Sequence, residues 1–247
     1  INIIADNLRD RYKSGFSVLK EIIQNADDAA SQVGRDVQLD FGFSEGLPDA
    51  DHTLLKGPAI FFLNNGSFSE QDARAIRSFG LNSKAADSSA IGKFGLGMKS
   101  VFHFCEAFFW IAHDENLDKQ EILNPWSGSK EYPPPQSAWD DFSSTDADQI
   151  KTCLKKILNG STKNSASFFL LWLPLRQERH LKFGNEKVGS IISEFPGDDR
   201  KQLDFLFKPD LVKELSSLLP LLRNLISIQY WSPGKSQSLE MQYSIQM

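Results

Sequence analysis

The sequence predicts an α+β fold, a two-layer sandwich in which a mixed β-sheet is covered by helices on one face. Three observations support this prediction. Apolar residues recur at helical spacing early in the chain, short apolar runs of strand length follow, and the end of the chain indicates a helix and then a β-hairpin. Helices and strands mixed in this way bury their apolar surfaces as layers around a core.

The first half of the chain predicts one long helix and three strands. Residues 17–30, SVLKEIIQNADDAA, have the apolar spacing of an amphipathic helix. VQLDFGF at 37–43 alternates like a half-buried strand, and PAIFFLN at 58–64 is a short apolar run that fits a central strand. A polar loop is expected at 82–90, and AFFWIAH at 107–113 is expected to be the third strand.

The second half is less regular. Residues 114–165 are the least organised in the sequence and are expected to be an insertion, with YPPPQ as an exposed loop and Trp126 and Trp139 in a local mini-core. SFFLLWLPL at 167–175 is expected to return to the sheet. LVKELSSLLPLLRNLI then reads as a helix that is broken or kinked at Pro220, and SIQYW and LEMQYSIQ flank a turn-rich stretch like the arms of a hairpin.

Length and composition favour a single cytoplasmic unit. The chain has 247 residues, 40% of them hydrophobic, with a formal net charge of −5, so nucleic acid is not an expected partner of this piece. No run approaches the roughly 20 apolar residues of a membrane span, and no secretory signal is visible. Residues 1–200 are expected to form one domain, and 201–247 a helix and hairpin that extend the same unit. Cys105 and Cys153 make neither a disulfide framework nor a metal set. Because the chain opens with INIIADNLRD and no Met, it is expected to be a fragment whose further domains lie elsewhere in a larger protein.

A glycine-rich stretch, GKFGLGMKS at residues 92–100, has the composition of a phosphate-binding turn. It is not a P-loop, because Met98 separates Gly97 from Lys99, and its glycines do not have the spacing of a dinucleotide-binding fingerprint. Glycines still allow close approach of the backbone, and a helix that starts within MKSVFHFCE would offer free N–H groups to an anion. An ordinary tight turn remains the alternative.

The helix at 17–30 carries a separate polar stripe. At about 100° per residue, Asn25 lies about 40° and Asp28 about −20° from Glu21, so the three share one narrow strip at the edge of the apolar face. Lys20, Gln24 and Asp27 are expected on the solvent-facing arc. An amide oxygen is a good ligand for Mg²⁺, and a carboxylate one turn away can polarise a water molecule. The stripe therefore suits Mg-ATP, with ordinary solvated surface as the alternative.

Two motifs resemble those of a known family. LKEIIQNADDA is similar to the N-box of the Hsp90-like ATPases, and IGKFGLGMKSVFHFCE is similar to the second glycine box of that group. LNNGSFSEQDARAI stands where the group has its adenine-recognition box, and LWLPLR and LSSLLPLLRNLISIQYW are also similar to sacsin-type members. The resemblance is strongest to the sacsin-type and MORC-type branches, and it implies the Bergerat ATP-binding fold.

The resemblance also implies roles for individual residues. Glu21 matches the general base for hydrolysis, Asn25 the Mg²⁺ ligand and Asp28 a carboxylate near the nucleotide. Asn64 matches the aspartate that hydrogen-bonds the adenine amino group, and Gly66 the first glycine of that box. The remaining residues belong to the lid and the phosphate loop: Lys84 in the lid, Gly92, Phe94, Gly95, Leu96 and Gly97 in the loop, and Lys99, which either reaches a phosphate or solvates the start of the helix.

The sequence departs from the family pattern at three positions. Asn64 replaces the usual aspartate; its oxygen can still accept a hydrogen bond, but without charge, so base selectivity is expected to be softer. Phe68 replaces the second glycine of the same box, which should alter the floor of the adenine pocket or the base of the lid. Ser167 is only a weak substitute for the threonine that precedes the last core strand in the family.

The function implied by the resemblance is Mg²⁺-dependent ATP binding and slow hydrolysis in a larger chaperone-like or defence-type protein. ATP would order a lid at about residues 66–91, and lid closure would build an ATP-dependent homodimer contact. Three alternatives are carried with it. A binding module that holds ATP without turnover would not need Glu21, a histidine-kinase catalytic domain usually lacks a base at that position, and a MORC-like or MutL-like clamp would need a transducer domain downstream.

Overall fold

The computed structural model describes residues 15–30, 37–77, 98–105, 107–114, 117–123, 139–160, 167–175, 182–183, 186–187, 210–235 and 238–246. Within them the α+β class and the mixed sheet are confirmed. The main sheet has seven strands in the order β4-β3-β5-β2-β1-β8-β9. Its neighbouring strands are antiparallel except β1 and β8, which are parallel. In chain order the strands are β1 (Val37–Ser44), β2 (Ala59–Asn64), β3 (Phe108–Asp114), β4 (Leu117–Leu123), β5 (Phe168–Pro174), β8 (Leu225–Pro233) and β9 (Leu239–Gln246), with a separate two-stranded ribbon of β6 (Lys182–Phe183) and β7 (Glu186–Lys187).

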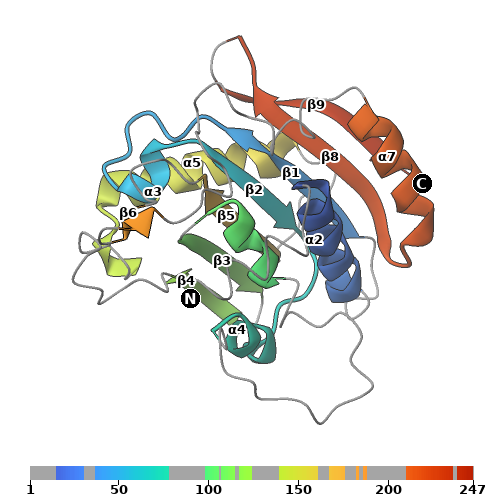
Figure 1. The fold of residues 1–247 in the computed structure, drawn as a ribbon, viewed down its shortest axis with the longest axis horizontal. Helices are drawn as coiled ribbons and strands as arrows, with labels where there is room; N and C mark the ends of the chain where they lie inside the picture. The colour runs from blue at the N-terminus through green and yellow to red at the C-terminus, as the bar shows by residue number, and fades with distance from the viewer. Residues whose placement is uncertain are drawn as a thin grey trace.

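Helices lie on both sides of this sheet and not on one face alone as expected, because α5 covers the face opposite α2 and α7 (Figure 1). The expected helix at 17–30 is confirmed and starts two residues earlier. A short helix after the glycine-rich stretch is also present, as a 3₁₀ helix. The helices are α2 (Gly15–Ala30), α3 (Thr53–Lys56), α4 (Glu70–Arg77), α5 (Ser144–Gly160) and α7 (Asp210–Leu218), and the 3₁₀ helices are η1 (Met98–His103), η2 (Trp139–Asp141) and η4 (Leu219–Leu221).

The first core lies between one face of the sheet and the helices α2 and α7. In β1, Leu39, Phe41 and Phe43 point to this face, as the alternation of the sequence predicts, and each is at most 5% exposed. The expectation of a half-buried strand was wrong, because the polar residues between them are buried as well in this interior strand of the sheet. Val18 and Ile23 of α2 are fully buried against them. At about 25 cal/mol per Å² of buried apolar surface, this layer supplies much of the stabilisation that fixes α2 on the sheet.

A second core on the opposite face corrects the expectation for residues 114–165. This segment forms the edge strand β4 and the helix α5, whose Ile150 and Ile157 pack under the sheet with Phe109 and Trp172. Trp139 contacts the rings of Phe109 and Phe142, so the expected mini-core exists at this position, whereas Trp126 lies outside the described residues. The segment reads as irregular because charged side chains surround the few apolar residues of α5 and β4.

The start of α5 is held by a capping box. The Asp146 N–H donates to the Ser143 hydroxyl at 3.1 Å, while the Ser143 N–H donates to the Asp146 carboxylate at 2.9 Å. The same carboxylate accepts from the N–H groups of Asp51 and His52 at 2.7 and 3.1 Å. One side chain therefore caps α5 and ties it to the turn that precedes α3.

The C-terminal part differs from its prediction in where the helix stops. α7 ends at Leu218, and Pro220 lies in the short η4, so the expected break is confirmed. The following Leu225 already belongs to β8, which runs parallel to β1 and pairs with β9 as the expected hairpin. An apolar run that fits either a helix or a buried strand cannot be assigned by periodicity alone, and here pairing with β1 makes it a strand.

Candidate functional site

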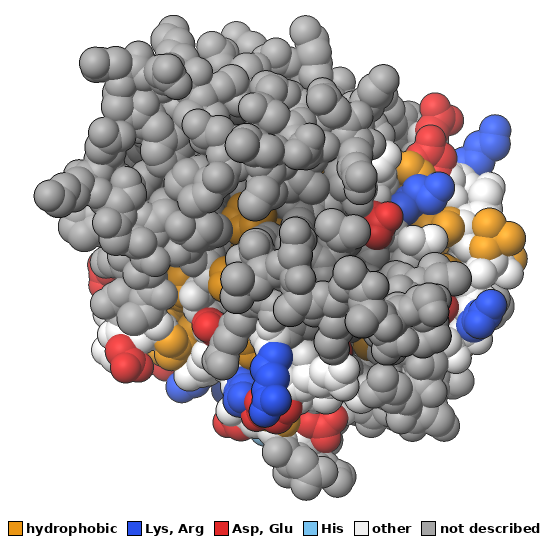
Figure 2. All heavy atoms as spheres, turned by 60° about the horizontal axis from the view of Figure 1, so that its bottom comes forward, with side chains coloured by type: hydrophobic (Ala, Val, Ile, Leu, Met, Phe, Trp, Pro, Cys, Tyr) orange, Lys and Arg blue, Asp and Glu red, His pale blue; other side chains and the backbone are white. Residues whose placement is uncertain are grey.

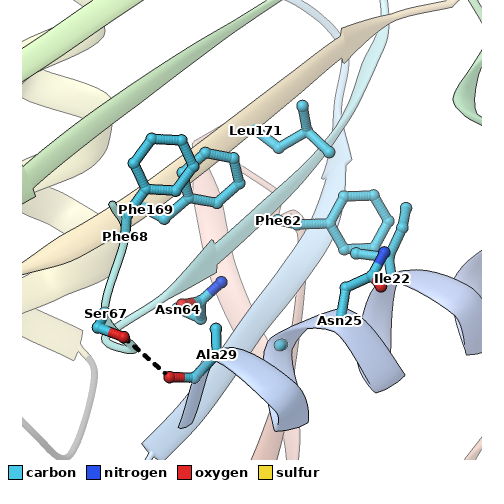
Figure 3. A pocket seen from close by; sticks show the side chains of 10 residues that line it. Ile22, Asn25, Ala29, Phe62, Asn64, Ser67, Phe68, Phe169 and Leu171 are labelled. Atoms are coloured by element: carbon cyan, nitrogen blue, oxygen red, sulfur yellow. Dashed lines mark hydrogen bonds between the residues drawn. The ribbon is translucent and has the colours of Figure 1, made fainter. Parts of the chain in front are cut away.

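A small pocket lies between α2 and the ends of β2 and β5 (Figure 3). Two amide side chains, Asn25 from α2 and Asn64 from β2, contribute its main polar groups, and apolar and aromatic side chains contribute most of the wall. The cavity measures about 20 Å³, room for roughly one water molecule. The lining residues are Ile22, Asn25, Ala26, Ala29, Phe62, Asn64, Ser67, Phe68, Phe169 and Leu171.

Asn25 is placed by the burial of α2. It follows Ile22 and Ile23 by two to three residues, so it lies at the border of the apolar face, and it is only 6% exposed. Its amide nitrogen is buried and makes no hydrogen bond within the described part of the chain. A buried polar atom without a partner costs about 1–3 kcal/mol, so this atom marks a position that a ligand could satisfy.

Asn64 closes β2 and faces the pocket from the sheet. It pairs with Phe169 of β5 and Leu39 of β1, so the sheet register fixes its position. Its side-chain oxygen accepts a hydrogen bond from the Gly66 N–H at 3.0 Å, which bends the chain out of the strand. Gly66 leaves little room for a side chain, because a Cβ on it would lie 3.0 Å from that oxygen and 3.3 Å from the Ala29 Cβ.

Phe68 forms part of the pocket wall instead of leaving it open. Its ring stacks on Phe169, with centroids 4.7 Å apart and planes 13° apart, and lies 5.0 Å from the Trp110 ring. It is 7% exposed. The replacement of a glycine by this ring therefore lines the pocket with an aromatic pair, which suits a flat apolar ligand and narrows the space for it.

The position of α2 depends on Asp27, and here the sequence interpretation was wrong. Asp27 was expected on the solvent-facing arc, but it is buried, and its Oδ1 accepts from the N–H groups of Asn224 and Leu225 at 2.7 and 2.8 Å. The Arg223 N–H also donates to this carboxylate, at 3.1 Å. On the helical wheel Asp27 lies beside Ile23, at the border of the buried face. It can therefore lie under the turn between η4 and β8.

The other two members of the polar stripe are not in the wall of the pocket. Glu21 is half-buried one turn before Asn25, and Asp28 is exposed. The pKa of Asp28 is raised above its ordinary value, first by partial burial and then by repulsion from Asp27, while Arg223 opposes the shift. The structure thus brings Asn25 and Asn64 together in one pocket, whereas Glu21 and Asp28 lie on the helix of Asn25 but outside the pocket lining.

Several residues that the sequence singled out lie outside the described residues. These are Lys84, Gly92, Phe94, Gly95, Leu96 and Gly97. The backbone of Lys99 is in η1, and Ser167 is buried just before β5.

The structure also adds residues that the sequence did not assign to the site. Ile22, Ala26 and Ala29 were identified only as the apolar arc of a helix, and Phe62 and Leu171 only as strand residues. Ser67 was not singled out, although its hydroxyl donates to the Ala29 carbonyl at 3.1 Å and joins the loop after β2 to the end of α2. Their spacing gives no signal for a pocket, because the same apolar pattern serves a closed core.

Charge and metal-ligating groups give no further site among the described residues. Acidic and basic side chains are interspersed over the described part of the face in Figure 2. The described residues contain no group of three or more His, Cys, Asp or Glu side chains placed to hold a metal ion. None of their helices combines the length and apolar character needed to cross a membrane.

Comparison with known proteins shows one family. The family model described as Sacsin domain matches residues 2–244. A 127-residue segment is 35% identical to human sacsin; the match covers 48% of this chain and 3% of sacsin. Among solved structures, the N-terminal domain of a DNA repair protein aligns with a TM-score of 0.47 and 13% identity, over 98% of this chain and 56% of that one.

Proposed function

The chain belongs to the Sacsin domain family, and from this premise we propose that it binds Mg-ATP in the pocket between Asn25 and Asn64 and hydrolyses it slowly. Sacsin-type domains are related to the Hsp90-like ATPases. Since the matched segment spans only 3% of human sacsin, the proposal concerns this module and not the activity of a whole protein.

One observation carries the proposal. The amide nitrogen of Asn25 is buried, lacks a partner within the described residues and lies in a pocket with Asn64 on the opposite side. A fold that only needed to close this core could place Leu or Met at position 25 and avoid the cost of an unpaired polar group. A polar ligand that enters the pocket removes this cost, and the aromatic pair of Phe68 and Phe169 offers its base a surface for stacking.

The residues present fit a magnesium ion. A half turn about the last bond of Asn25 exchanges its oxygen and nitrogen, so the unpaired end can present the oxygen ligand that Mg²⁺ prefers. Mg²⁺ usually takes one or two protein oxygens and completes its shell with phosphate oxygens and water. When bound, Mg-ATP would supply the phosphoryl group that is transferred, and Asn25 would orient the metal against it.

Glu21 is the residue that would move a proton. It precedes Asn25 by one helical turn and is half-buried, so its carboxylate would lie on the same helix as the metal ligand. There it would accept the proton of the attacking water. Asp28, whose pKa is raised, lies one turn to the other side of Asn25 and would contact the ligand from outside the pocket.

Opening and closing of the pocket belong to the same proposal. A cavity of about 20 Å³ does not accommodate a purine, so the loop that carries Ser67 and Phe68 must move away from α2 when the base enters. Ordering of a lid at about residues 66–91 and an ATP-dependent homodimer contact would couple this movement to the rest of a larger chaperone-like or defence-type protein.

A binder without turnover is the second candidate. It is favoured by one observation: Glu21 is not among the residues that line the pocket. Turnover and affinity measured together separate the two functions.

The test is Glu21→Gln, which keeps the shape of the side chain but cannot accept a proton. Hydrolysis should fall by about two to four orders of magnitude, with little change in ATP affinity. Lys20→Gln, an exposed position on the same helix, is the matched control and should retain the rate. Equal hydrolysis rates for wild type and Glu21→Gln would contradict the assignment of Glu21 as the general base. ATP binding without any hydrolysis by wild type would support the second candidate, a binder without turnover.

A further inference from the structure

The amide of Asn64 has a fixed orientation. Amide oxygen and nitrogen are distinguished by their partners, and here the partner is the Gly66 N–H, which can only donate. The oxygen of Asn64 must therefore face Gly66, at 3.0 Å, and the nitrogen must take the other side. Figure 3 shows this nitrogen directed into the pocket, toward the space between the sheet and α2. Asn64 is 8% exposed, so water has little access to it.

This orientation decides which hydrogen bond the sheet side of the pocket offers. An Asn nitrogen is a donor with two hydrogens, whereas a carboxylate at the same position could only accept. Rotating the amide to present its oxygen would place two N–H groups, those of Asn64 and Gly66, against each other and leave the Gly66 N–H without an acceptor. Such a loss costs about 1–3 kcal/mol in a buried position, so the donor orientation is the stable one.

Once the loop with Ser67 and Phe68 has moved to admit a base, the side chains beside Asn64 offer apolar surface to a flat ring whose edge would meet this donor. Phe62 and Leu171 rise from the neighbouring strands, and the stacked rings of Phe68 and Phe169 close one side. A planar heteroaromatic ring can lie against these apolar surfaces, and the atoms on its edge are then read by the amide. On a purine, position 6 carries either an amino group, which donates, or an oxygen, which accepts.

We propose that Asn64 is a specificity-determining residue that makes the pocket take 6-oxo purine nucleotides, such as those of hypoxanthine and guanine, at least as well as adenine nucleotides. This inference rests on the proposed nucleotide function of the same pocket. A purine oxygen at position 6 accepts from the Asn64 nitrogen, whereas the amino group of adenine faces that nitrogen as donor against donor, so adenine pairs there only through a neighbouring ring nitrogen or the second lone pair of the Asn64 oxygen.

The probes are ATP and ITP, because their bases differ only at position 6 and in the hydrogen on the adjacent N1, and both lack the 2-amino group of guanine. Dissociation constants of both with Mg²⁺ should be measured by calorimetry on wild type, Asn64→Asp and Asn65→Asp. Asn65 is the matched control, because the same substitution one residue later adds the same charge. Asn65 does not line the pocket, and its side-chain oxygen accepts from the Gln38 N–H at 2.8 Å.

Wild type should bind ITP as tightly as ATP or more tightly. Asn64→Asp should reverse this to a preference for ATP of roughly tenfold to a hundredfold, which is the discrimination of a well-placed base contact. Asn65→Asp should keep the wild-type ratio of the two dissociation constants. A wild-type preference for ATP above tenfold would overturn the inference without any variant, as would an unchanged ratio in folded Asn64→Asp. If neither triphosphate binds wild type at millimolar concentration, the proposed function fails and the inference with it.

Discussion

The carboxylate of Asp27 accepts a hydrogen bond from the N–H of Leu225 at 2.8 Å, across 198 residues of chain. This contact joins the helix that carries Asn25 to the first residue of β8. The position of Asn25 relative to the sheet thus depends on a carboxylate two residues away that faces a different element. The N–H groups of Arg223 and Asn224 share the same acceptor.

Removing this acceptor should destabilise the fold. Asp27→Ala leaves the N–H of Leu225 buried without a partner, and those of Arg223 and Asn224 only partly reachable by water. The free energy of unfolding should fall by about 2–3 kcal/mol in a denaturant titration. Asp28→Ala, next in sequence but exposed, should change it by less than about 0.5 kcal/mol. Equal effects of the two variants would show that Asp27 is not the anchor.

The capping carboxylate Asp146 should make stability depend on pH. Burial raises its pKa, but the hydrogen bonds from the N–H groups of His52, Ser143 and Asp51 outweigh this, so the net pKa lies below the ordinary 3.8. Because the pKa of Asp146 is lower in the folded state, its carboxylate stabilises the fold fully above the pKa of the unfolded state. This stabilisation is lost as the pH falls through the pKa of the folded state. Wild type should therefore lose stability below about pH 4.

Asp146→Asn tests this. At neutral pH it should cost about 1–2 kcal/mol, because one of the acceptor oxygens becomes a donor that faces an N–H group. The difference in free energy of unfolding between wild type and the variant should shrink as the pH falls below about 4, as measured by urea unfolding at several pH values. Asp148→Asn, exposed on the same helix, is the control. A difference that is constant with pH would refute the assignment.

Gly66 should affect the pocket more than the fold. Gly66→Ala places a Cβ 3.0 Å from the Asn64 oxygen and 3.3 Å from Ala29, close enough to displace both by a few tenths of an ångström. We expect nucleotide affinity to fall about tenfold while the stability changes by no more than about 1 kcal/mol. Gly42→Ala contrasts with it, since a Cβ there would meet the Trp231 carbonyl oxygen at 2.2 Å and should destabilise the sheet itself. Unchanged affinity in Gly66→Ala would contradict the packing of the loop against α2.

Local sequence pattern predicted the elements that carry a clear signal. α2 has helical spacing, β1 alternates, β2, β3 and β5 are short apolar runs, and turn residues mark the β8–β9 hairpin. α5 and β4 were missed, because they cover an edge of the sheet with few apolar residues each and sit between segments of turn-like composition. Local pattern holds little information about which distant strand such a segment covers.

The candidate site, too, could be predicted only where local sequence pattern carries the information. The polar stripe of α2 indicates Asn25 from residue spacing alone, since helical geometry relates Glu21, Asn25 and Asp28 directly. The burial of Asp27 could not be predicted in that way, because its partners are backbone N–H groups about 200 residues further along the chain. The orientation of the Asn64 amide likewise depends on a turn geometry at Gly66 that residue types do not specify.

The most direct test of Mg-ATP binding in this pocket is a calorimetric titration with ATP, with and without Mg²⁺, on wild type and Asn25→Ala. We predict binding in the micromolar-to-millimolar range for wild type that weakens at least tenfold without Mg²⁺, and a variant that stays folded but binds weakly under both conditions. Stability should be unchanged or slightly higher in the variant, because the unpaired amide is removed. Equal Mg²⁺-dependent binding by wild type and Asn25→Ala would contradict the proposal that this pocket holds Mg-ATP.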